Sequence, residues 1–420
     1  MQSSNFFLTI AKILTIILGL IAILSGGSIF LLYGIGLIMA TEAIALDSTI
    51  AAVGGLVFGV GLGSMLVWHG ASSLLERPSS LVRLPAFWIL LVIYIPVLII
   101  GQIIISYDFF SNITFPPIHL IGAVMPALII VTFAINHLRS TRFRWRDLTI
   151  FLSGGIFVSP FFAIIAEVIF GGLVLITTLT IAALLPGGLE YLTELADDLQ
   201  NPAWIDNPNN VEELLAYPPV YITLIAVFVV IAPIFEELFK LIAVMLSSYR
   251  HPSRAQIFVW GLMSGAGFAL MENTFNTLFA VEIWAGVMLL RIGATTMHCF
   301  STGLFALGWH SFITHRQVGR LIGLYSLSVL IHALWNGLII GITGFGLSVG
   351  DTLSFDLIQT GTGLLIVTLS GLLLLLGISM IGGFIWVTRK LQKDMSEKSD
   401  SEESDQLPNS EVSILVENGE

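Results

Sequence analysis

Long apolar stretches dominate this sequence of 420 residues and decide what it can fold into. A helix needs about 20 apolar residues to cross the hydrocarbon core of a bilayer. Lipid offers no hydrogen-bond partners, so the backbone of such a stretch must satisfy itself as a helix. The sequence therefore predicts an all-α, polytopic transmembrane bundle of about ten spans: 13–40, 49–72, 85–106, 118–137, 149–184, 218–246, 256–281, 284–313, 320–345 and 357–388.

The composition excludes other classes of protein. Apolar residues make up 56% of the chain and charged residues 11%, whereas a soluble globular protein has about 25% charged residues. The single cysteine, Cys299, excludes an intrachain disulfide and a cysteine-based metal cluster. No region is basic enough to bind nucleic acid, so we expect the lipid bilayer, and no nucleic acid, as a partner.

Lys and Arg recur in every second connection between the apolar stretches. Arg77 and Arg83 follow the second stretch and four arginines follow the fourth, whereas the connections between them carry Asp and Glu but no Lys or Arg. Connections rich in Lys and Arg stay in the cytoplasm. This alternation predicts that both termini are cytoplasmic.

The same pattern divides the chain into five regions. We expect an N-terminal transmembrane region of about five spans, an acidic extracytoplasmic loop, a polar transmembrane core, a final span, and an acidic cytoplasmic tail. The tail is rich in Ser, Glu and Asp and has no aromatic residues, so it is predicted to be disordered. The regions are 1–185, 186–217, 218–345, 346–388 and 389–420.

Ionisable residues interrupt four consecutive stretches of the polar core. Such a residue at the centre of a membrane helix costs roughly 2.5–3.5 kcal/mol on insertion scales, and it usually faces a bundle interior and marks a functional site. Four neighbouring helices that share this feature predict a buried reaction centre. The residues are Glu236, Glu237 and Lys240, then Glu272 and Asn273, then Arg291 and His298, then His332 and Asn336.

The paired glutamates admit two interpretations. Lys240 lies one helical turn from both Glu236 and Glu237. Neighbouring residues on a helix point about 100° apart, so one glutamate can pair with Lys240 while the other faces a substrate or a water. A structural ion pair that fixes helix register is the alternative. A structural pair needs only one carboxylate, so the doubled glutamate favours chemistry.

The histidines and the last polar residues also have a structural alternative. A lone intramembrane histidine more often bonds a neighbouring helix, but His298 and His332 both fall near mid-membrane on neighbouring spans. Asn336, one turn from His332, is predicted to hold its tautomer or to bind an oxyanion. Glu272 lies in a glycine-rich span, where it can instead act as a hydrogen-bonding group between helices. Glu167 in the fifth stretch is a candidate without an assigned role.

Carboxylates and imidazoles without an obvious Ser or Cys nucleophile suit the activation of water. A glutamate would deprotonate the water while His and Asn groups stabilise the oxyanion of a cleaved carbonyl. Two histidines and a glutamate also form a known zinc ligand set, although the sequence has no His-Glu-x-x-His motif. The residues leave the use of a metal open, with Zn²⁺ as the candidate cofactor.

Four motifs together resemble those of the PrsW family of polytopic prokaryotic intramembrane proteases, which are related in motif pattern to CAAX-processing endopeptidases. The resemblance covers residues 220–345. The motifs are Pro-Ile-Phe-Glu-Glu-Leu-Phe-Lys at 233–240, Gly-Phe-Ala-Leu-Met-Glu-Asn at 267–273, Met-His at 297–298 and His-Ala-Leu-Trp-Asn at 332–336.

The resemblance implies an intramembrane endopeptidase of the prokaryotic cytoplasmic membrane. Glu236 and Glu237 would be its paired catalytic glutamates, and Glu272, His298 and His332 would complete the site. Its partner would be a membrane-anchored protein substrate, for example a signalling regulator such as an anti-sigma factor. The alternatives are an ion-coupled transporter and a non-catalytic scaffold that retains the motifs. A transporter would carry polar residues in both halves, and this N-terminal half has almost none.

Overall fold

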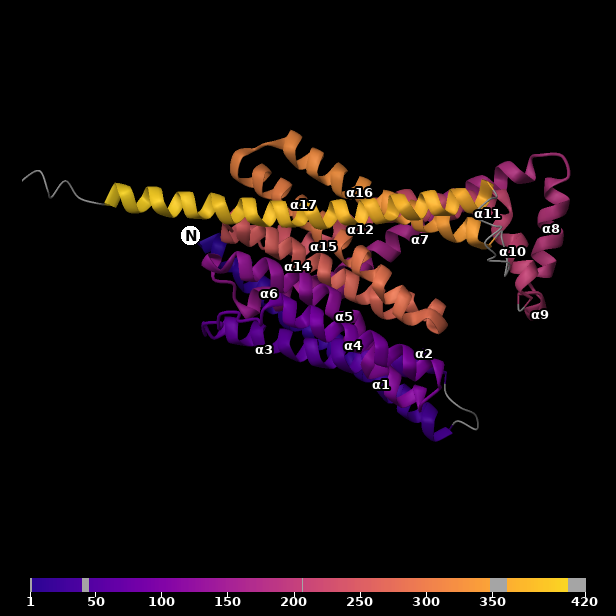
Figure 1. The fold of residues 1–420 in the computed structure, drawn as a ribbon, viewed down its shortest axis with the longest axis horizontal. Coiled ribbons are helices and arrows are strands. Elements are labelled where there is room, and N and C mark those ends of the chain that lie inside the picture. The colour runs from indigo at the N-terminus through magenta and orange to yellow at the C-terminus, as the bar shows by residue number, and fades with distance from the viewer. Residues whose placement is uncertain (1, 40–44, 206, 348–360, 407–420) are drawn as a thin grey trace, which may run out of the picture.

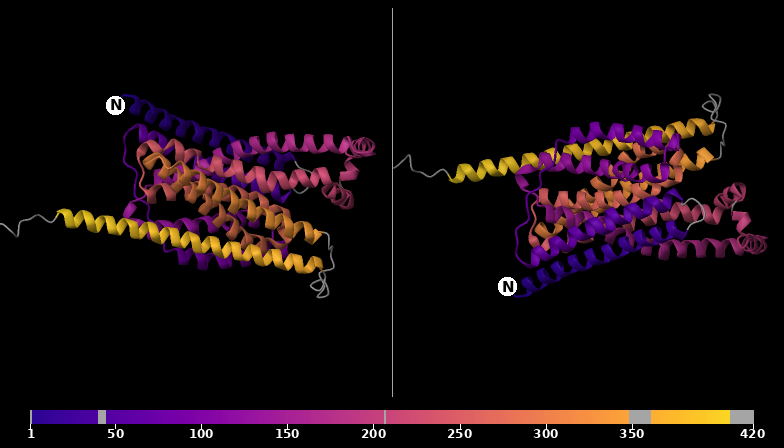
Figure 2. Two further views of the ribbon diagram at one scale, coloured as in Figure 1. Left: turned by 90° about the horizontal axis from the view of Figure 1, so that it is seen from above. Right: turned by 90° about the horizontal axis from the view of Figure 1, so that it is seen from below.

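The chain folds into one bundle of helices that run side by side (Figures 1 and 2). Within the described ranges every regular element is a helix, and the β contact is an isolated bridge between Leu81 and Arg144. The prediction of an all-α polytopic bundle is confirmed. The computed structural model describes residues 2–39, 45–205, 207–347 and 361–406.

Two π-helical segments, η1 and η3, lie within the helices of the N-terminal half, and its last helix, α7, packs against α11 (Pro218–Ile225) and α12 (Ala232–Lys240) of the C-terminal half. The elements are α1 (Gln2–Met39), α2 (Leu46–Gly54), η1 (Gly55–Leu62), α3 (Gly63–Leu74), α4 (Phe87–Ser106), α5 (Ser111–His137), η2 (Arg139–Thr141), α6 (Trp145–Ser153), η3 (Gly154–Val158) and α7 (Ser159–Ala183).

The C-terminal half contains the polar core. Its elements are α8 (Gly188–Asp198), α9 (Pro202–Ile205), α10 (Pro208–Ala216), α11 (Pro218–Ile225), η4 (Ala226–Ile231), α12 (Ala232–Lys240), α13 (Ile242–Leu246), η5 (Ser248–Arg250), α14 (Arg254–Phe275), η6 (Asn276–Ile283), α15 (Trp284–His315), α16 (Val318–Leu347) and α17 (Gly361–Gln406).

Nine helical segments of the described residues are long and apolar enough to cross a membrane. They account for nine of the ten predicted spans. The stretch 256–281 instead forms α14 and the 3₁₀ segment η6, and α14 is buried along most of its length. A helix that packs on protein rather than lipid needs fewer large apolar side chains, which explains why α14 is less apolar than the others.

Two further segments are longer than the predicted spans. The stretch 149–184 lies in one continuous helical segment, Trp145–Ala183. Pro160 lies in the first turn of α7, where its missing N–H costs little. At the other end of the chain α17 continues to Gln406, so residues 389–406 are helical rather than disordered. Lys393 and Glu397, 3.4 Å apart and one turn apart, support this extension.

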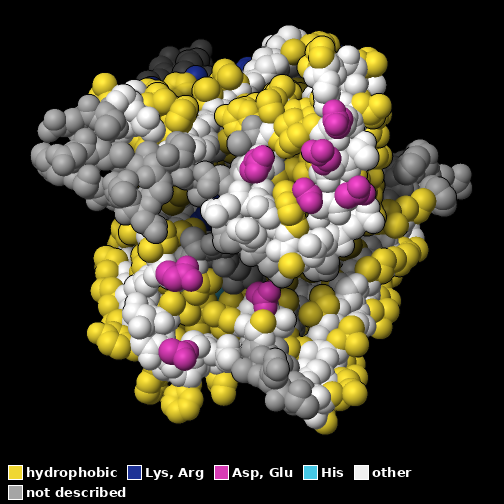
Figure 3. Space-filling view, turned by 90° about the vertical axis from the view of Figure 1, so that its right-hand side faces the viewer, with side chains coloured by type: hydrophobic (Ala, Val, Ile, Leu, Met, Phe, Trp, Pro, Cys, Tyr) yellow, Lys and Arg dark blue, Asp and Glu magenta, His cyan; other side chains and the backbone are white. Residues whose placement is uncertain are grey.

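Both described ends of the chain lie at one end of the bundle, because α14 runs along the bundle in addition to the nine segments above and makes the number of passages even (Figures 1 and 2). Helices α8–α10 lie at the opposite end, where Asp and Glu gather and Lys and Arg are barely visible (Figure 3). The cytoplasmic location of the termini stays a prediction. The part of the tail at 407–420 and the connection at 348–360 fall outside the described residues.

Glycines bring α14 close enough to its neighbours to build the site. A Cβ added at Gly261 would lie 2.7 Å from the Thr302 carbonyl oxygen of α15, and one added at Gly265 would lie 2.2 Å from that of His298. Gly267 meets the Leu152 carbonyl of α6 in the same way. This glycine-rich helix therefore packs closely on α6 and α15, and the contact sets the position of the α15 backbone next to the polar cluster.

Candidate active site

The paired glutamates and Lys240 lie on α12, and all three side chains are buried. The Lys240 Nζ atom is 3.2 Å from Glu236 Oε2 and 2.8 Å from Glu237 Oε1. Their side chains are 8% exposed for Glu236 and 0% for the other two. A single ammonium therefore contacts both carboxylates, whereas the sequence suggested that it would pair with one of them.

Glu237 is held by donors from three helices. His332 Nδ1 lies 3.0 Å from its Oε1, which Lys240 also contacts. The hydroxyl groups of Ser301 and Thr302 donate to its Oε2 at 3.0 and 3.3 Å. Every lone-pair direction of a carboxylate is then in use, because it can accept about four hydrogen bonds. Glu237 thus joins α12, α15 and α16 and is not free to bind a water.

Glu236 contacts fewer hydrogen-bond donors than Glu237 does. Its Oε2 accepts from Lys240 and lies 3.6 Å from His332 Nε2. Because His332 Nδ1 faces the Glu237 carboxylate, we assign the proton of the imidazole to Nδ1, and Nε2 then carries a lone pair. Two acceptors lie 3.6 Å apart, and a water that bridges them from one side, or a cation bound to both, would satisfy them.

His298 belongs to a second chain of contacts. Its Nε2 lies 2.8 Å from Glu272 Oε2, and its Nδ1 accepts from Lys240 Nζ at 2.8 Å. Arg291 Nη2 donates to the same Glu272 oxygen at 2.6 Å. The Phe268 ring lies under the ammonium, with Nζ 4.1 Å from its centroid, a cation–π geometry. His298 therefore holds Lys240 in place, and Glu272 orients the His298 imidazole.

Asn336 is separate from this network. The sequence predicted that it would hold the His332 tautomer or bind an oxyanion. Its Nδ2 instead donates to the Phe228 carbonyl oxygen at 2.9 Å, in the π-helical η4, and it is Glu237 that contacts His332 Nδ1. Residues four apart on a helix differ by about 40° in direction, which is enough to turn Asn336 toward η4. The structure joins the other six predicted residues: Glu236, Glu237, Lys240, Glu272, His298 and His332.

Four hydroxyl-bearing residues of the site escaped the sequence reasoning. Ser301 and Thr302 follow His298 by three and four residues, and this spacing alone places them on its helix face. Ser264 Oγ donates to the Lys240 carbonyl at 2.5 Å, where α12 ends. Tyr325 donates its hydroxyl to the Ile234 carbonyl at 2.8 Å. These contacts fix the backbone on both sides of the glutamates, and no local sequence pattern marks the last two.

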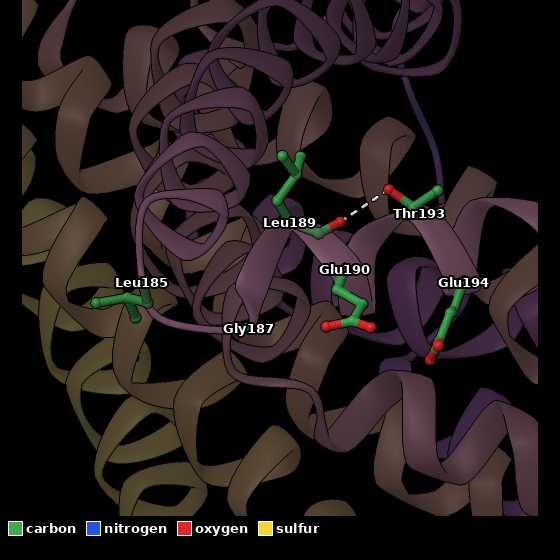
Figure 4. Close-up of a pocket in the computed structure, with 6 residues that line it drawn as sticks. All are labelled: Leu185, Gly187, Leu189, Glu190, Thr193 and Glu194. Atoms are coloured by element: carbon green, nitrogen blue, oxygen red, sulfur yellow. Dashed lines mark hydrogen bonds between the residues drawn. The ribbon is translucent and has the colours of Figure 1, made fainter.

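The cluster lies deep in the bundle. His298 is fourteen residues from the start of the 32-residue helix α15. At a rise of about 1.5 Å per residue this distance is about 21 Å, which places the imidazole near the middle of a membrane of ordinary thickness. The surface hollow of Figure 4, about 560 Å³ in volume, is elsewhere, at the junction of α7 and α8. Its carboxylates, Glu190 and Glu194, have no imidazole or cation among the other residues that line it: Leu185, Gly187, Leu189 and Thr193.

The residues at the centre of the cluster suit a metal ion. Glu236, His298 and His332 offer ligand atoms within 4.8 Å of one another. Two imidazoles and one carboxylate form a ligand set of catalytic zinc, and the other nitrogen of each imidazole faces a carboxylate, as is usual for metal-bound histidine. Lys240 contacts His298 Nδ1 and Glu236 Oε2, so a metal bound to these atoms requires the ammonium to withdraw.

The fold and the cluster together define a class, that of multi-pass membrane proteins with a buried carboxylate, imidazole and ammonium centre. The family model described as PrsW family intramembrane metalloprotease matches residues 144–358, about half of the chain. The chain belongs to this family and is therefore an integral membrane peptidase. Neither a search of curated proteins nor a search of solved structures finds a match.

Proposed function

We propose that this chain is an intramembrane endopeptidase in which Glu236 activates a water to cleave a membrane-anchored protein. The observation that carries the proposal is the pair of acceptors, Glu236 Oε2 and His332 Nε2, that face each other across 3.6 Å. A water that bridges them from one side can donate one hydrogen bond to each, which is the position of a nucleophile next to its base. Family membership and the depth of the cluster support a peptide bond inside the membrane as its target.

The two glutamates take different roles in this proposal. Glu236 keeps one oxygen, Oε1, without a hydrogen bond to any residue that the structure describes, so it can accept a proton. Glu237 is fully engaged and acts as a positioning residue, since it sets the direction of both His332 and Lys240. Lys240 in turn brings Glu236 and His298 together.

The reaction then runs in two proton transfers. Glu236 takes a proton from the water as the water oxygen bonds to the scissile carbonyl carbon. The Glu236 carboxylic acid gives this proton to the amide nitrogen as the carbon–nitrogen bond breaks, leaving a new carboxylic acid and a new amine, which then exchange a proton to become a carboxylate and an ammonium. The oxyanion was expected to meet His and Asn donors. Here His298 Nε2 faces Glu272 and Asn336 Nδ2 donates to η4, so the nearby positive charge of Lys240 is the better candidate.

Zinc is the metal that the ligand set favours. Glu236, His298 and His332 would hold it. When bound, zinc would polarise the scissile carbonyl and make the attacking water more acidic. With or without a metal, Glu237 would orient the His332 imidazole and Glu272 the His298 imidazole.

The substrate in this proposal is a membrane-anchored protein of a prokaryotic cytoplasmic membrane. A regulator of signalling, such as an anti-sigma factor, is the candidate that the family resemblance suggests. Membership of a peptidase family favours this function over the transporter and the scaffold.

The proposal is tested by the fate of solvent oxygen. The purified chain would be reconstituted in liposomes with a single-span reporter, and the reaction run in ¹⁸O-labelled water. We expect cleavage within the apolar span of the reporter and one ¹⁸O atom in the new carboxyl group, detected by mass spectrometry. Cleavage confined to the soluble part of the reporter, or a new carboxyl group without label, would contradict water attack inside the membrane.

A further inference from the structure

Glu167 lies on α7 at the level of the paired glutamates. Helices α7 and α12 pack against each other and run in opposite directions (Figure 1). The rings of Phe162 and Phe239 are 5.7 Å apart, and those of Phe170 and Phe235 are 4.8 Å apart. These two contacts lie on either side of Glu167 along α7 and on either side of the glutamate pair along α12. Glu167 and the pair are therefore at the same depth.

The Glu167 carboxylate makes no hydrogen bond or ion pair with any residue in the described parts of the chain. It is half-buried, and it is close enough to Glu236, Glu272 and Lys240 to interact with each electrostatically. A carboxylate that stabilises the packing of two helices would hydrogen-bond to a group on the neighbouring helix. Glu167 therefore faces the cluster without a structural role that the contacts explain.

The cations of the cluster are paired with carboxylates other than that of Glu167. Lys240 contacts two carboxylates, and Arg291 contacts a third. Both cations are thus engaged, and Glu167 is a fourth carboxylate in surroundings where an unpaired charge is costly. It is not among the residues able to share a metal ion with His298 and His332. A cation from outside the chain would give Glu167 a partner.

The position of α7 indicates where that cation comes from. This helix packs mainly against η3, α11, η4 and α12. Its other face is exposed, with Ile164 at 58% and Val168 at 68%, as expected for side chains that contact lipid. The seam between α7 and α12 therefore separates the Glu236 carboxylate from the bilayer. A membrane-anchored substrate that entered between these two helices would reach the cluster without leaving the membrane.

We propose that Glu167 binds a Lys or Arg side chain of the substrate and so selects substrates with a basic residue near the cleaved bond. The inference rests on the proposed peptidase function and names its specificity. Long basic side chains can reach a carboxylate while their apolar stems stay along the helix surface. The Phe170 ring, one turn from Glu167, offers the cation a second favourable contact. A hydrogen bond between two charged groups here corresponds to a preference of about 10- to 100-fold.

The test uses single-span reporters that differ at one position, with Lys, Gln or Glu placed in turn at each site around the cleaved bond. Each reporter would be cleaved in liposomes by the wild-type chain and by the Glu167→Gln and Glu167→Lys variants. Glu190→Gln, on α8 at the end of the bundle, is the matched control because its carboxylate is remote from the cluster. Values of kcat and KM would be measured separately.

We expect wild type to prefer the Lys reporter at one or two positions by about 10- to 100-fold in kcat/KM, mainly through KM. Glu167→Gln should abolish this preference, and Glu167→Lys should transfer it to the Glu reporter. Glu190→Gln should keep it. A wild type without charge preference at any position, or a Glu167→Gln variant that slows all reporters by one factor, would overturn the inference.

Measuring how tightly the reporters bind, without cleavage, distinguishes a failure of this inference from a failure of the proposed function. Reporter affinity would be measured in a Glu236→Gln background, where cleavage is not needed. If wild type cleaves no reporter but the Lys reporter still binds in a Glu167-dependent manner, the peptidase proposal fails and the Glu167 inference stands. If reporters are cleaved but bind without regard to charge, the Glu167 inference fails alone.

Discussion

Replacing Lys240 by methionine tests whether the buried ammonium holds the cluster together. The variant keeps the apolar stem but removes a cation that lies 2.8 Å from Glu237 Oε1 and 3.2 Å from Glu236 Oε2. Breaking a buried ion pair from one side costs about 3–5 kcal/mol, because the remaining charge has no partner. Glu237 keeps donors from His332 and two hydroxyl groups, so we expect a loss near the lower end, about 3 kcal/mol.

The assay is reversible unfolding in mild detergent, with Lys393→Met as the matched control. Lys393 is 76% exposed and pairs with Glu397 on the surface of α17, so its loss should cost less than about 1 kcal/mol. The double variant Lys240→Met with Glu237→Gln removes both charges of the closer pair. It should recover about 0.5–3 kcal/mol relative to the sum of the single variants. The reasoning is refuted if Lys240→Met unfolds like the Lys393→Met control.

Three further predictions concern packing, metal and the amide of α16. Gly265→Ala would place a Cβ 2.2 Å from the His298 carbonyl oxygen, so we expect a loss of about 1–3 kcal/mol in unfolding. Gly286→Ala, which meets no atom within 4 Å, should not destabilise, and equal effects would contradict the close contact. Lys240→Met should bind Zn²⁺ more tightly than wild type in calorimetry and elemental analysis, because the ammonium no longer competes for the ligand atoms. An unchanged affinity would show that Lys240 and the metal do not compete. Asn336→Ala should lower reporter cleavage less than tenfold, about the loss of one neutral hydrogen bond, and a loss near that of a catalytic base would place the amide in the reaction.

The sequence predicts which residues meet because charge in hydrocarbon is expensive. Each of the four apolar stretches carries ionisable residues: Glu236, Glu272, His298 and His332. Contact with lipid would cost each of them free energy, so they are expected to face the bundle interior and one another. The all-α fold follows from the same energetics. What the sequence does not predict is the rotation of each helix about its axis, and small rotations decide hydrogen-bond partners. Asn336 shares a helix face with His332, yet it contacts η4 instead.

The roles of the two glutamates also needed the structure. The sequence does not distinguish the roles of Glu236 and Glu237. Donors on α12, α15 and α16 give Glu237 four hydrogen bonds, whereas Glu236 accepts from Lys240 and keeps its Oε1 without a hydrogen bond to any described residue. Ser301 and Thr302 were within reach of sequence reasoning, since they share a face with His298. The burial of α14 was harder to predict from the sequence, because glycine-rich helices inside a bundle are less apolar than helices that face lipid.

The central claim is that Glu236 is the base and Glu237 its support, and the rate of cleavage by the two glutamine variants tests it most directly. Single-turnover cleavage of one membrane-anchored reporter would be measured for wild type, Glu236→Gln and Glu237→Gln in the same liposomes, with unfolding measured in parallel. We expect Glu236→Gln to fold like wild type and to lose about 10²–10⁴ in rate, the usual cost of a missing general base. Glu237→Gln should lose both stability and rate, because four contacts depend on its charge. A folded Glu236→Gln variant that cleaves the reporter as fast as wild type would contradict the account.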